Sequence, residues 1–417
     1  MWGRGDPLAS VPAAAGRRLA LRVTRDAERQ LRAGHPWLFA DSITPAPDAG
    51  TAAAGDLAVV FDRQRRFLAI GLYDPGSPLR VRVLHAGRPR PIDRSFWRER
   101  LQEALARRGP LVDSVGTTAY RWVHGENDRL PGLVLDRYAS TVVCKLYSAA
   151  WFPHLRDVLA EVAAIARPER VVLRMSRAVR NGPTFGLEEG MVLSGAGPGG
   201  PVRFRENGWL FEADVQHGQK TGHFLDQRDN RRLTGRYTAG ARVLDVFCCT
   251  GGFTVASAAG GATLVHSVDQ STAALATTRR NLAANGDVPR VAACTHRQTA
   301  GDAFEVLERL AASGDRYDVV VIDPPSFAPR QANVPAALRA YGRLTDLGLA
   351  LLEGGGLLVQ ASCSARVSSA EFLSVVRNRA GRAGVALDEL AVTGHPLDHP
   401  IGFPQGAYLK ALFARRR

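Results

Sequence analysis

Three acidic residues lie at the ends of predicted apolar strands, where they could bind a small polar ligand. Asp245 lies in the run VLDVF, Asp269 ends TLVHSVD, and Asp323 follows YDVVVI. The carboxyl ends of parallel strands meet at the ligand crevice of an open α/β sheet, where an acid can bind two ribose hydroxyls. Gly251 and Gly252 allow a tight turn and close backbone approach after the first strand. Together these residues predict a site for a nucleoside-containing cofactor.

The glycine pattern narrows the choice of cofactor. No GxGxxG run follows the first strand of the predicted sheet to cradle a pyrophosphate, so S-adenosylmethionine, which carries no phosphate, fits better than a nicotinamide dinucleotide. Asp302, in AGDAF, follows the third predicted strand, RVAACTH (290–296), and could meet the adenine amino group. Capping of a helix N-terminus is its alternative and more common role. The other acids could likewise do no more than cap their strands.

A second group of residues could hold a flat ring beside a nucleophile. In DPPSF, Pro324 and Pro325 remove two N–H donors, so Asp323 and nearby carbonyls could accept hydrogen bonds from a base or an amine. Phe327 could stack on a ring. Cys363, in QASCSAR, ends the next predicted strand, where a thiolate could act as nucleophile. A small buried apolar side chain is the alternative role for this cysteine.

One further segment is unusually polar. GQKTGHFLDQRDNRR (218–232) precedes the first strand of the sheet and contains Lys220. Its Lys, Asp, Gln and Arg side chains could clamp a carboxylate or a phosphate. A solvated helix start is the alternative.

The elements that must position these residues alternate between strand and helix from about residue 206. Strands are predicted at ARVLDVF, TLVHSVD, YDVVVIDPP and GGLLVQASCS. Helices are predicted at GGFTVASAAGG, STAALATTRRNLAANG, AFEVLERLAAS and PAALRAYGRLTDLGLALL, with Ser271 as an N-cap. The alternation predicts a parallel, doubly wound α/β sheet over 206–417.

Three parts are predicted before this sheet. Residues 1–18 are expected to form a flexible tail. Residues 19–90 contain short strand runs and turns and predict a small β domain. Its turn DRQRR would expose Arg63, Arg65 and Arg66 to a partner. Residues 91–205 predict a connector helix over 93–108 followed by a central α+β domain.

Composition limits the partners and the compartment. The 417 residues include 54 Lys+Arg and 40 Asp+Glu, a net charge of +14, and the only lysines are Lys145, Lys220 and Lys410. Arginine-rich codon usage would explain this excess, but a field of guanidinium groups also favours phosphate and nucleic acid. Five cysteines without a CxxC pair predict neither a disulfide framework nor a zinc site. Without a signal peptide or a membrane segment, a soluble cytoplasmic protein is expected.

Many segments, in a fixed order, resemble bacterial class I S-adenosylmethionine-dependent methyltransferases that carry a PUA domain and modify large-subunit ribosomal RNA. The matching segments are GHPWLF (34–39), IGLYDPGSPLRVRVL (70–84), RWVHGENDRLPGLVLDRY (121–138), QKTGHFLDQRDNRR, LDVFCCTGGF, SVDQS, DPPSF, SCS, DHP and YLKAL. The likeness covers about residue 19 to the end, and the group that it indicates is the bacterial 23S rRNA cytosine-5 methyltransferase I group. It implies a Rossmann-like doubly wound methyltransferase domain, preceded by a PUA-like β-barrel and an α+β central domain.

The resemblance also implies roles for single residues. S-adenosylmethionine would be bound by Gln227, Arg228, Asp245, Phe247, Gly251, Gly252, Asp269, Asp302 and Asp323. The substrate would contact Pro324, Pro325, Phe327 and Lys220. Cys363 would match the nucleophile of cytosine-5 methyltransferases, and Asp323 would bind the cytosine N3/N4 edge. The implied partner is 23S rRNA or a large-subunit assembly intermediate, and a homodimer is one form to expect.

Other functions stay open at this point. Guanine N7 is already nucleophilic, so its methylation at the DPPSF site would need no cysteine. A non-catalytic RNA-binding or ribosome-assembly factor could use the same scaffold, although the near-complete set of cofactor residues argues against it. A small-molecule methyltransferase is disfavoured by the PUA-like segment and the net charge of +14.

Overall fold

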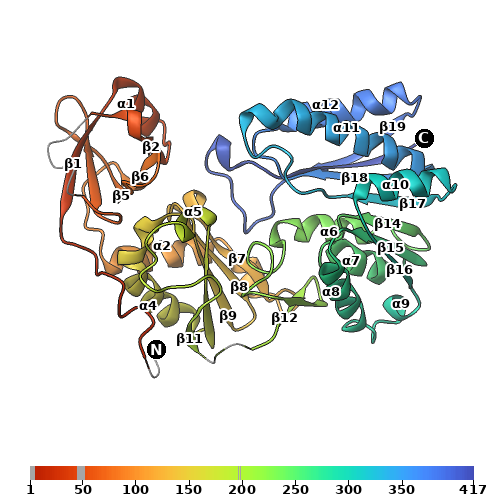
Figure 1. Cartoon of the computed structure of the whole chain (residues 1–417), viewed down its shortest axis with the longest axis horizontal. Helices are drawn as coiled ribbons and strands as arrows, with labels where there is room; N and C mark the ends of the chain where they lie inside the picture. The colour runs from red at the N-terminus through yellow and green to blue at the C-terminus, as the bar shows by residue number, and fades with distance from the viewer. Residues whose placement is uncertain (1–4, 45–51, 196, 198) are drawn as a thin grey trace. The chain divides into compact units, whose positions relative to one another are not determined.

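The computed structural model describes residues 5–44, 52–195, 197 and 199–417, and Figure 1 shows the whole chain. Its two compact units are not continuous in sequence. The first unit comprises Met1–Phe204, Ala213–Leu225 and Leu397–Phe403, and the second comprises Arg205–Glu212, Asp226–Pro396 and Pro404–Arg417. The sequence predicted one continuous domain over 206–417. In the structure, Ala213–Leu225 and Leu397–Phe403, which lie within that range, belong to the first unit.

The first unit begins with a six-stranded sheet of order β2-β6-β5-β4-β1-β3. Its elements are β1 (Arg18–Val23), α1 (Arg25–Arg32), β2 (Trp37–Phe39), η1 (Ala40–Ser42), β3 (Ile43–Thr44), β4 (Leu57–Phe61), β5 (Phe67–Tyr73) and β6 (Leu79–Ala86). Alternate residues of β1 are buried, as expected for a strand with one face on a core. The predicted turn DRQRR joins the antiparallel strands β4 and β5, and Arg63, Arg65 and Arg66 are exposed on it.

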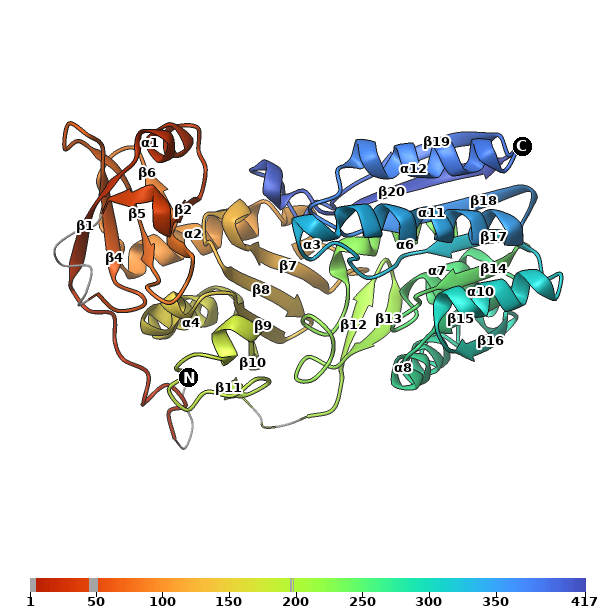
Figure 2. The same ribbon diagram turned by 45° about the horizontal axis from the view of Figure 1, so that its top comes forward.

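The same unit contains a five-stranded sheet of order β11-β10-β9-β8-β7. Its elements are α2 (Arg94–Ala106), α3 (Gly109–Val112), β7 (Ala119–His124), η3 (Gly125–Asp128), β8 (Leu133–Tyr138), β9 (Thr141–Leu146), η4 (Ala149–His154), α4 (Leu155–Ala166), β10 (Arg170–Met175), α5 (Arg177–Arg180) and β11 (Val192–Gly195). Figure 2 shows β7 to β10 side by side. Trp97 of α2, Trp122 of β7 and Trp151 of η4 are fully buried in its core.

The predicted flexible tail differs from the structure over its described part. Leu8 is buried in the core of the five-stranded sheet. The Arg156 guanidinium donates to the Leu8 carbonyl and forms a 2.6 Å ion pair with Asp6. The burial of Leu8 and the contacts of Arg156 together anchor this segment. The composition of the segment gave no indication of these contacts.

The hairpin of β12 (Val202–Glu206) and β13 (Trp209–Ala213) leads to a seven-stranded sheet of order β16-β15-β14-β17-β18-β20-β19. Its elements are η5 (Leu225–Gln227), α6 (Arg228–Gly235), β14 (Arg242–Val246), α7 (Gly252–Gly260), β15 (Leu264–Asp269), α8 (Thr272–Ala283), α9 (Pro289–Ala292), β16 (Thr295–Ala300), α10 (Ala303–Ala312), β17 (Tyr317–Ile322), η6 (Gln331–Asn333), α11 (Val334–Leu351), β18 (Leu352–Ser362), α12 (Ser369–Arg382), β19 (Leu387–Thr393), η7 (Pro404–Gly406) and β20 (Lys410–Arg416).

This sheet is covered by helices on both faces, which explains its continuous apolar strands. Successive residues of β17 point to opposite sides: Val320 packs in one core with α10, α11 and α12, and Val319 packs in the other with residues of α7 and α9. The predicted doubly wound architecture is confirmed. Ser271 also caps α8 as predicted, because its hydroxyl accepts from the Ala274 N–H.

Two parts of the sheet differ from the prediction. RVAACTH was expected to be the third strand, but Pro289 begins the short helix α9 and the strand runs over Thr295–Ala300. At one edge, β20 is inserted antiparallel between β18 and β19, so the sheet is not wholly parallel. Among the described residues, no helix is long and apolar enough to cross a membrane.

Candidate active site

Three parallel neighbours, β14, β15 and β17, bring the predicted acids to one edge of the sheet. Asp245 is the penultimate residue of β14, Asp269 ends β15, and Asp323 immediately follows β17. The register pairs Val246 with Val268 and with Ile322. The three acids therefore lie at carboxyl ends of strands that are level with one another, as the sequence predicted.

The turn between β14 and α7 is backbone-strained in a way that explains its glycines. Phe247, Cys249 and Gly251 all have positive φ, at 63°, 49° and 78°. A Cβ on Gly251 would lie 2.5 Å from Cγ2 of Thr278, and one on Gly252 would lie 2.6 Å from Cδ of Arg231. A side chain at either glycine would therefore collide with Thr278 or with Arg231.

Asp245 is fully buried, and only one of its two carboxylate oxygens accepts a hydrogen bond. The Thr254 hydroxyl donates to its Oδ2 over 2.6 Å, whereas its Oδ1 is buried without a hydrogen-bond partner. Burial, together with the charges of Asp323 and Asp269, raises the pKa of Asp245 to about 7. A buried acceptor without a donor suits a cationic ligand, and the ammonium or sulfonium group of S-adenosylmethionine meets that requirement.

Asp269 and Asp302 have different surroundings. Asp269 Oδ2 accepts from the Cys249 N–H and Oδ1 from the Ser271 N–H, each over 2.9 Å, so this carboxylate fixes the glycine turn to the start of α8. Asp302 is exposed and caps α10 by accepting from the N–H groups of Phe304 and Glu305. The capping alternative for Asp302 is therefore observed, and its contact with adenine stays a prediction.

The FLDQR segment reaches the third acid. Gln227 donates from Nε2 to Asp323 Oδ1 over 2.8 Å, and its own Oε1 accepts from Asn230 Nδ2 over 2.6 Å. This chain of amides orients the Asp323 carboxylate. Arg228 is buried, with its Nε 3.6 Å from Asp229 Oδ1.

The DPPSF and SCS segments meet beside Asp323. The Cys363 thiol lies 3.7 Å from the Pro324 carbonyl oxygen and is half-buried. Phe327 packs against Tyr341 with ring centroids 5.3 Å apart, while Pro325 is exposed. Cys363 thus lies beside the residue that follows Asp323, and the roles of both residues in catalysis stay predictions.

Two residues beside Cys363 were missed from the sequence. The Tyr341 hydroxyl forms 2.9 Å hydrogen bonds with Ser362 and Ser364, which flank the cysteine. Lys410 Nζ donates to the carbonyls of Ser364, Val367 and Tyr408. Burial lowers the pKa of Lys410 to about 8, and negative charge on Cys363 opposes this shift. The one available signal was a lysine within the apolar run YLKALF.

Lys220 lies in the other compact unit. Its ammonium is 4.1 Å from the centre of the Phe224 ring, and its carbonyl accepts from Lys145 Nζ. Its predicted contact with substrate stays a prediction.

Comparison with known proteins agrees with this geometry. A model of S-adenosylmethionine-dependent methyltransferases matches residues 192–414, and a model of PUA-like domains matches residues 21–86. A Ribosomal RNA large subunit methyltransferase of Deinococcus radiodurans is 48% identical over 409 residues, covering 97% of this chain and 99% of that protein. Ribosomal RNA large subunit methyltransferase I of Aeromonas hydrophila is 36% identical over 404 residues, covering 95% and 99%.

A solved structure shares the fold. It is described as a SAM-dependent methyltransferase from Streptococcus mutans, superposes with a TM-score of 0.80 at 21% identity, and is covered over its full length by 95% of this chain. Fold and site thus define a class, the S-adenosylmethionine-dependent methyltransferases that carry a PUA-like domain. Within that class, the chain belongs to the family of the Ribosomal RNA large subunit methyltransferase I proteins. The predicted family, fold class and cofactor are confirmed.

Proposed function

We propose that this enzyme forms 5-methylcytosine in 23S rRNA through a covalent adduct on Cys363. The observation that carries the proposal is the position of the Cys363 thiol, 3.7 Å from the carbonyl of Pro324, the residue that follows Asp323. The relatives named above support ribosomal RNA as the substrate. S-adenosylmethionine supplies the methyl group.

The C5 carbon of cytosine needs activation before it can take a methyl group. The Cys363 thiolate adds to C6, and C5 then acquires the nucleophilic character of an enamine. Asp323, oriented by Gln227 over 2.8 Å, accepts a hydrogen bond from the N4 amino group and holds the ring. After methyl transfer, a base removes the C5 proton, the bond between sulfur and C6 breaks, and Cys363 is released as the thiolate.

Replacement of Cys363 tests the covalent step. Cys363→Ala should abolish methylation of 23S rRNA while its affinity for S-adenosylmethionine, measured by calorimetry, stays within about twofold of the unmodified enzyme. Cys294→Ala is the matched control, because this half-buried cysteine lies between α9 and β16. Full methylation by Cys363→Ala would exclude the covalent role and favour guanine N7 as the target.

The form of the substrate and of the enzyme can be measured separately. We propose that the enzyme acts in the cytoplasm on 23S rRNA or on a large-subunit assembly intermediate, and that it can form a homodimer. Methylation of protein-free rRNA compared with that of isolated precursor particles distinguishes the two substrates, and sedimentation equilibrium reports the oligomeric state. Absence of S-adenosylmethionine binding in calorimetry would instead favour a non-catalytic assembly factor.

A further inference from the structure

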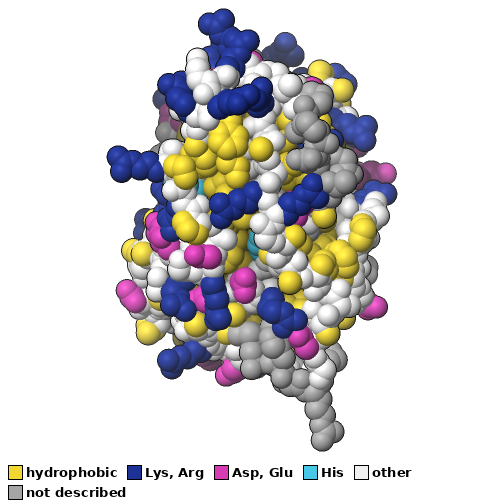
Figure 3. Space-filling model, turned by 90° about the vertical axis from the view of Figure 1, so that its left-hand side faces the viewer, with side chains coloured by type: hydrophobic (Ala, Val, Ile, Leu, Met, Phe, Trp, Pro, Cys, Tyr) yellow, Lys and Arg dark blue, Asp and Glu magenta, His cyan; other side chains and the backbone are white. Residues whose placement is uncertain are grey.

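A chain of polar side chains runs through the interior of the second unit, from the buried carboxyl group of Asp245 to the edge of the sheet. The molecular face in Figure 3 displays more basic than acidic side chains, with hydrophobic ones between them. The interior chain consists instead of two hydroxyl groups and an imidazole. The methyl transfer proposed above uses none of these three groups, so their role is unassigned.

Three hydrogen bonds make the chain continuous. The Thr254 hydroxyl donates to Asp245 Oδ2 over 2.6 Å and lies 2.7 Å from the Ser267 hydroxyl oxygen. The Ser267 hydroxyl oxygen lies 3.0 Å from Nε2 of His296. All three distances are ordinary for hydrogen bonds between such atoms. The four side chains therefore form an unbroken path.

The register of three adjacent strands explains why these side chains meet. Asp245 of β14 pairs with Ser267 of β15, and Ser267 pairs with Gln298 of β16. Because side chains two residues apart on a strand point to the same face, His296 lies on the face of Ser267. Helix α7, which packs on that face, supplies Thr254. Figure 1 shows β14, β15 and β16 in this order.

The two ends of the path differ in exposure. Asp245, Thr254 and Ser267 are fully buried. His296 is half-buried on β16, which is the edge strand of the sheet. A proton on Asp245 therefore has no direct contact with solvent, and His296 connects the path to the protein surface.

Asp245 has to change its protonation state when a cationic cofactor binds. Burial, together with the charges of Asp323 and Asp269, raises the pKa of Asp245 to about 7. At pH 6, about nine in ten molecules of the free enzyme then hold a proton there. A sulfonium or ammonium group favours the carboxylate. The proton must therefore leave a position that has no contact with solvent.

We propose that Thr254, Ser267 and His296 form an exit path through which Asp245 loses its proton as S-adenosylmethionine binds. The three residues act on the cofactor through Asp245 and are positioning residues. The inference rests on S-adenosylmethionine as the cofactor and on the predicted contact between its cation and Asp245. It does not depend on which base of the RNA is methylated.

The path can carry a proton because each of its groups can both donate and accept a hydrogen bond. Asp245 Oδ2 passes its proton to Thr254 Oγ1, and Thr254 passes its own hydroxyl proton to Ser267 Oγ. Ser267 passes its hydroxyl proton to His296 Nε2, and Nδ1 of the same ring releases its proton to water. One proton has then left, Asp245 is a carboxylate, and the charges of the other three groups are unchanged.

The groups around the path suit a relay by the neutral imidazole. Burial, with the nearby charges of His266 and Arg279, lowers the pKa of His296 to about 4. Near neutral pH the His296 ring therefore carries a hydrogen on one nitrogen and a lone pair on the other. Burial, with the charges of Asp245 and Asp269, raises the pKa of the Cys248 thiol. This thiol stays protonated and does not take part in the transfer.

Replacement of His296 by glutamine tests the path. Glutamine keeps a donor and an acceptor at the edge of the sheet, but it cannot exchange tautomers. Ser267→Ala removes the middle hydroxyl group. His266→Gln is the matched control, because this neighbouring histidine forms hydrogen bonds with Tyr317 and Thr299 and lies outside the path.

Proton release is followed by stopped flow at pH 6, with a pH-indicator dye in weakly buffered solution and saturating S-adenosylmethionine. The unmodified enzyme should release about 0.9 proton for each cofactor bound. His296→Gln and Ser267→Ala should release it at least about tenfold more slowly. His266→Gln should release it at the rate of the unmodified enzyme.

A path changes the rate of proton release and leaves its end points alone. His296→Gln should therefore keep the number of protons released and the calorimetric affinity for S-adenosylmethionine. A change in affinity without a change in rate would show a structural role and overturn the inference. Equal rates in His296→Gln and His266→Gln, or the absence of proton release from the unmodified enzyme, would overturn it as well.

The methyl-transfer assay keeps the two proposals apart. Retained methylation by Cys363→Ala together with slow proton release by His296→Gln would refute only the covalent mechanism. Loss of methylation by Cys363→Ala with rapid proton release by His296→Gln would refute only the exit path.

Discussion

Asp245 is the residue whose chemistry the fold alters most clearly. Burial raises its pKa to about 7, so the folded protein holds a proton there more tightly than the unfolded chain. This contribution to stability is complete below about pH 4 and is lost as the pH rises through 7. A cationic cofactor reverses the preference, because it favours the carboxylate.

The affinity for S-adenosylmethionine should therefore increase with pH. A pKa near 7 in the free enzyme predicts about tenfold tighter binding at pH 8 than at pH 6. Calorimetry at three pH values measures this slope, and Asp245→Asn should flatten it, whereas Asp302→Asn should keep it. An identical slope in Asp245→Asn would show that another group carries the pH dependence.

For single residues, the sequence predicted which side chains lie at the site better than it predicted their hydrogen-bond partners. The positions of Asp245 and Asp269 at the ends of apolar runs predicted that both acids would lie at the same edge of the sheet, because the carboxyl ends of parallel strands meet there. It could not show that Thr254 occupies one Asp245 oxygen or that Lys410 holds the loop after Cys363. Those contacts depend on side chains that come from separate elements.

Among the elements, the turn before α7 has no room for a side chain at Gly251. Gly251→Ala places a Cβ 2.5 Å from a buried threonine methyl group and in a left-handed backbone. It should cost more than about 2 kcal/mol of unfolding free energy and abolish cofactor binding. Gly261→Ala, with φ 101° and an ordinary 3.5 Å contact between its Cβ and Cα of Ala239, should cost about 1–2 kcal/mol from the backbone alone. Urea unfolding compares the two, and equal losses would contradict the steric account.

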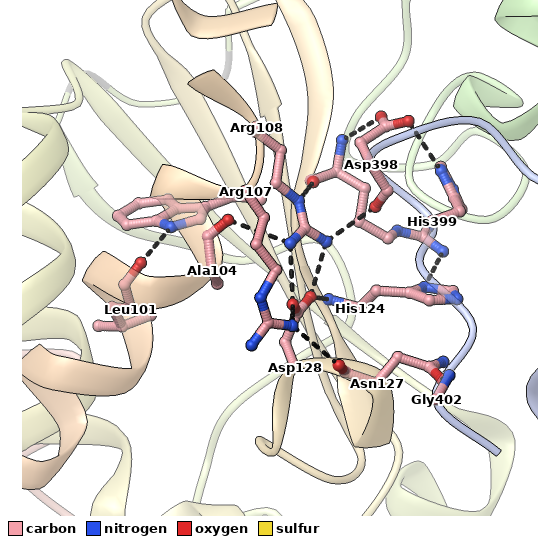
Figure 4. Close-up of polar contacts among 12 residues, drawn as sticks. Leu101, Ala104, Arg107, Arg108, His124, Asn127, Asp128, Asp398, His399 and Gly402 are labelled. Carbon is pink, nitrogen blue, oxygen red and sulfur yellow. Dashed lines mark hydrogen bonds and ion pairs between the residues drawn. The ribbon is translucent and has the colours of Figure 1, made fainter. Parts of the chain in front are cut away.

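The buried pair of Arg108 and Asp128, shown in Figure 4, should stabilise the central sheet far more than a surface pair does. Asp128→Asn leaves a buried guanidinium without its counter-charge and should cost about 3–5 kcal/mol. Glu308→Gln, which breaks the exposed pair with Arg343, should cost less than about 1 kcal/mol. Chemical unfolding of both variants checks the difference, and a small loss in Asp128→Asn would contradict this expectation.

The sequence predicted the helices and strands whose apolar residues recur at regular spacing. It did not predict segments whose position depends on contacts with residues far away in the chain. Helix α2 and the alternating strands were predictable because their apolar spacing reports their environment. The segment Leu397–Phe403 returns to the first unit, where the Asp398 carbonyl accepts from Arg108 across 290 positions of the sequence. No local pattern indicates such a return.

For the whole molecule, the net charge of +14 predicts steep salt dependence of RNA binding. The logarithm of the binding constant should fall with the logarithm of salt concentration at a slope of about −3 or steeper. Filter binding between low and physiological salt measures it, with S-adenosylmethionine affinity as the salt-insensitive control. A binding constant that does not change with salt concentration would indicate that the arginine excess reflects codon usage alone.

Composition and order of elements predicted the class of the molecule but not how the chain divides into units. Segments Ala213–Leu225 and Leu397–Phe403 belong to the first unit although they lie within the predicted last domain. The boundaries near 18, 90 and 205 stay predictions, because composition changes gradually there.

The central claim is the product. The purified enzyme is incubated with isotopically labelled S-adenosylmethionine and with 23S rRNA from a strain that lacks the enzyme. The nucleosides of the product RNA are then identified by mass spectrometry. We predict labelled 5-methylcytidine. Labelled 7-methylguanosine in its place would contradict the account.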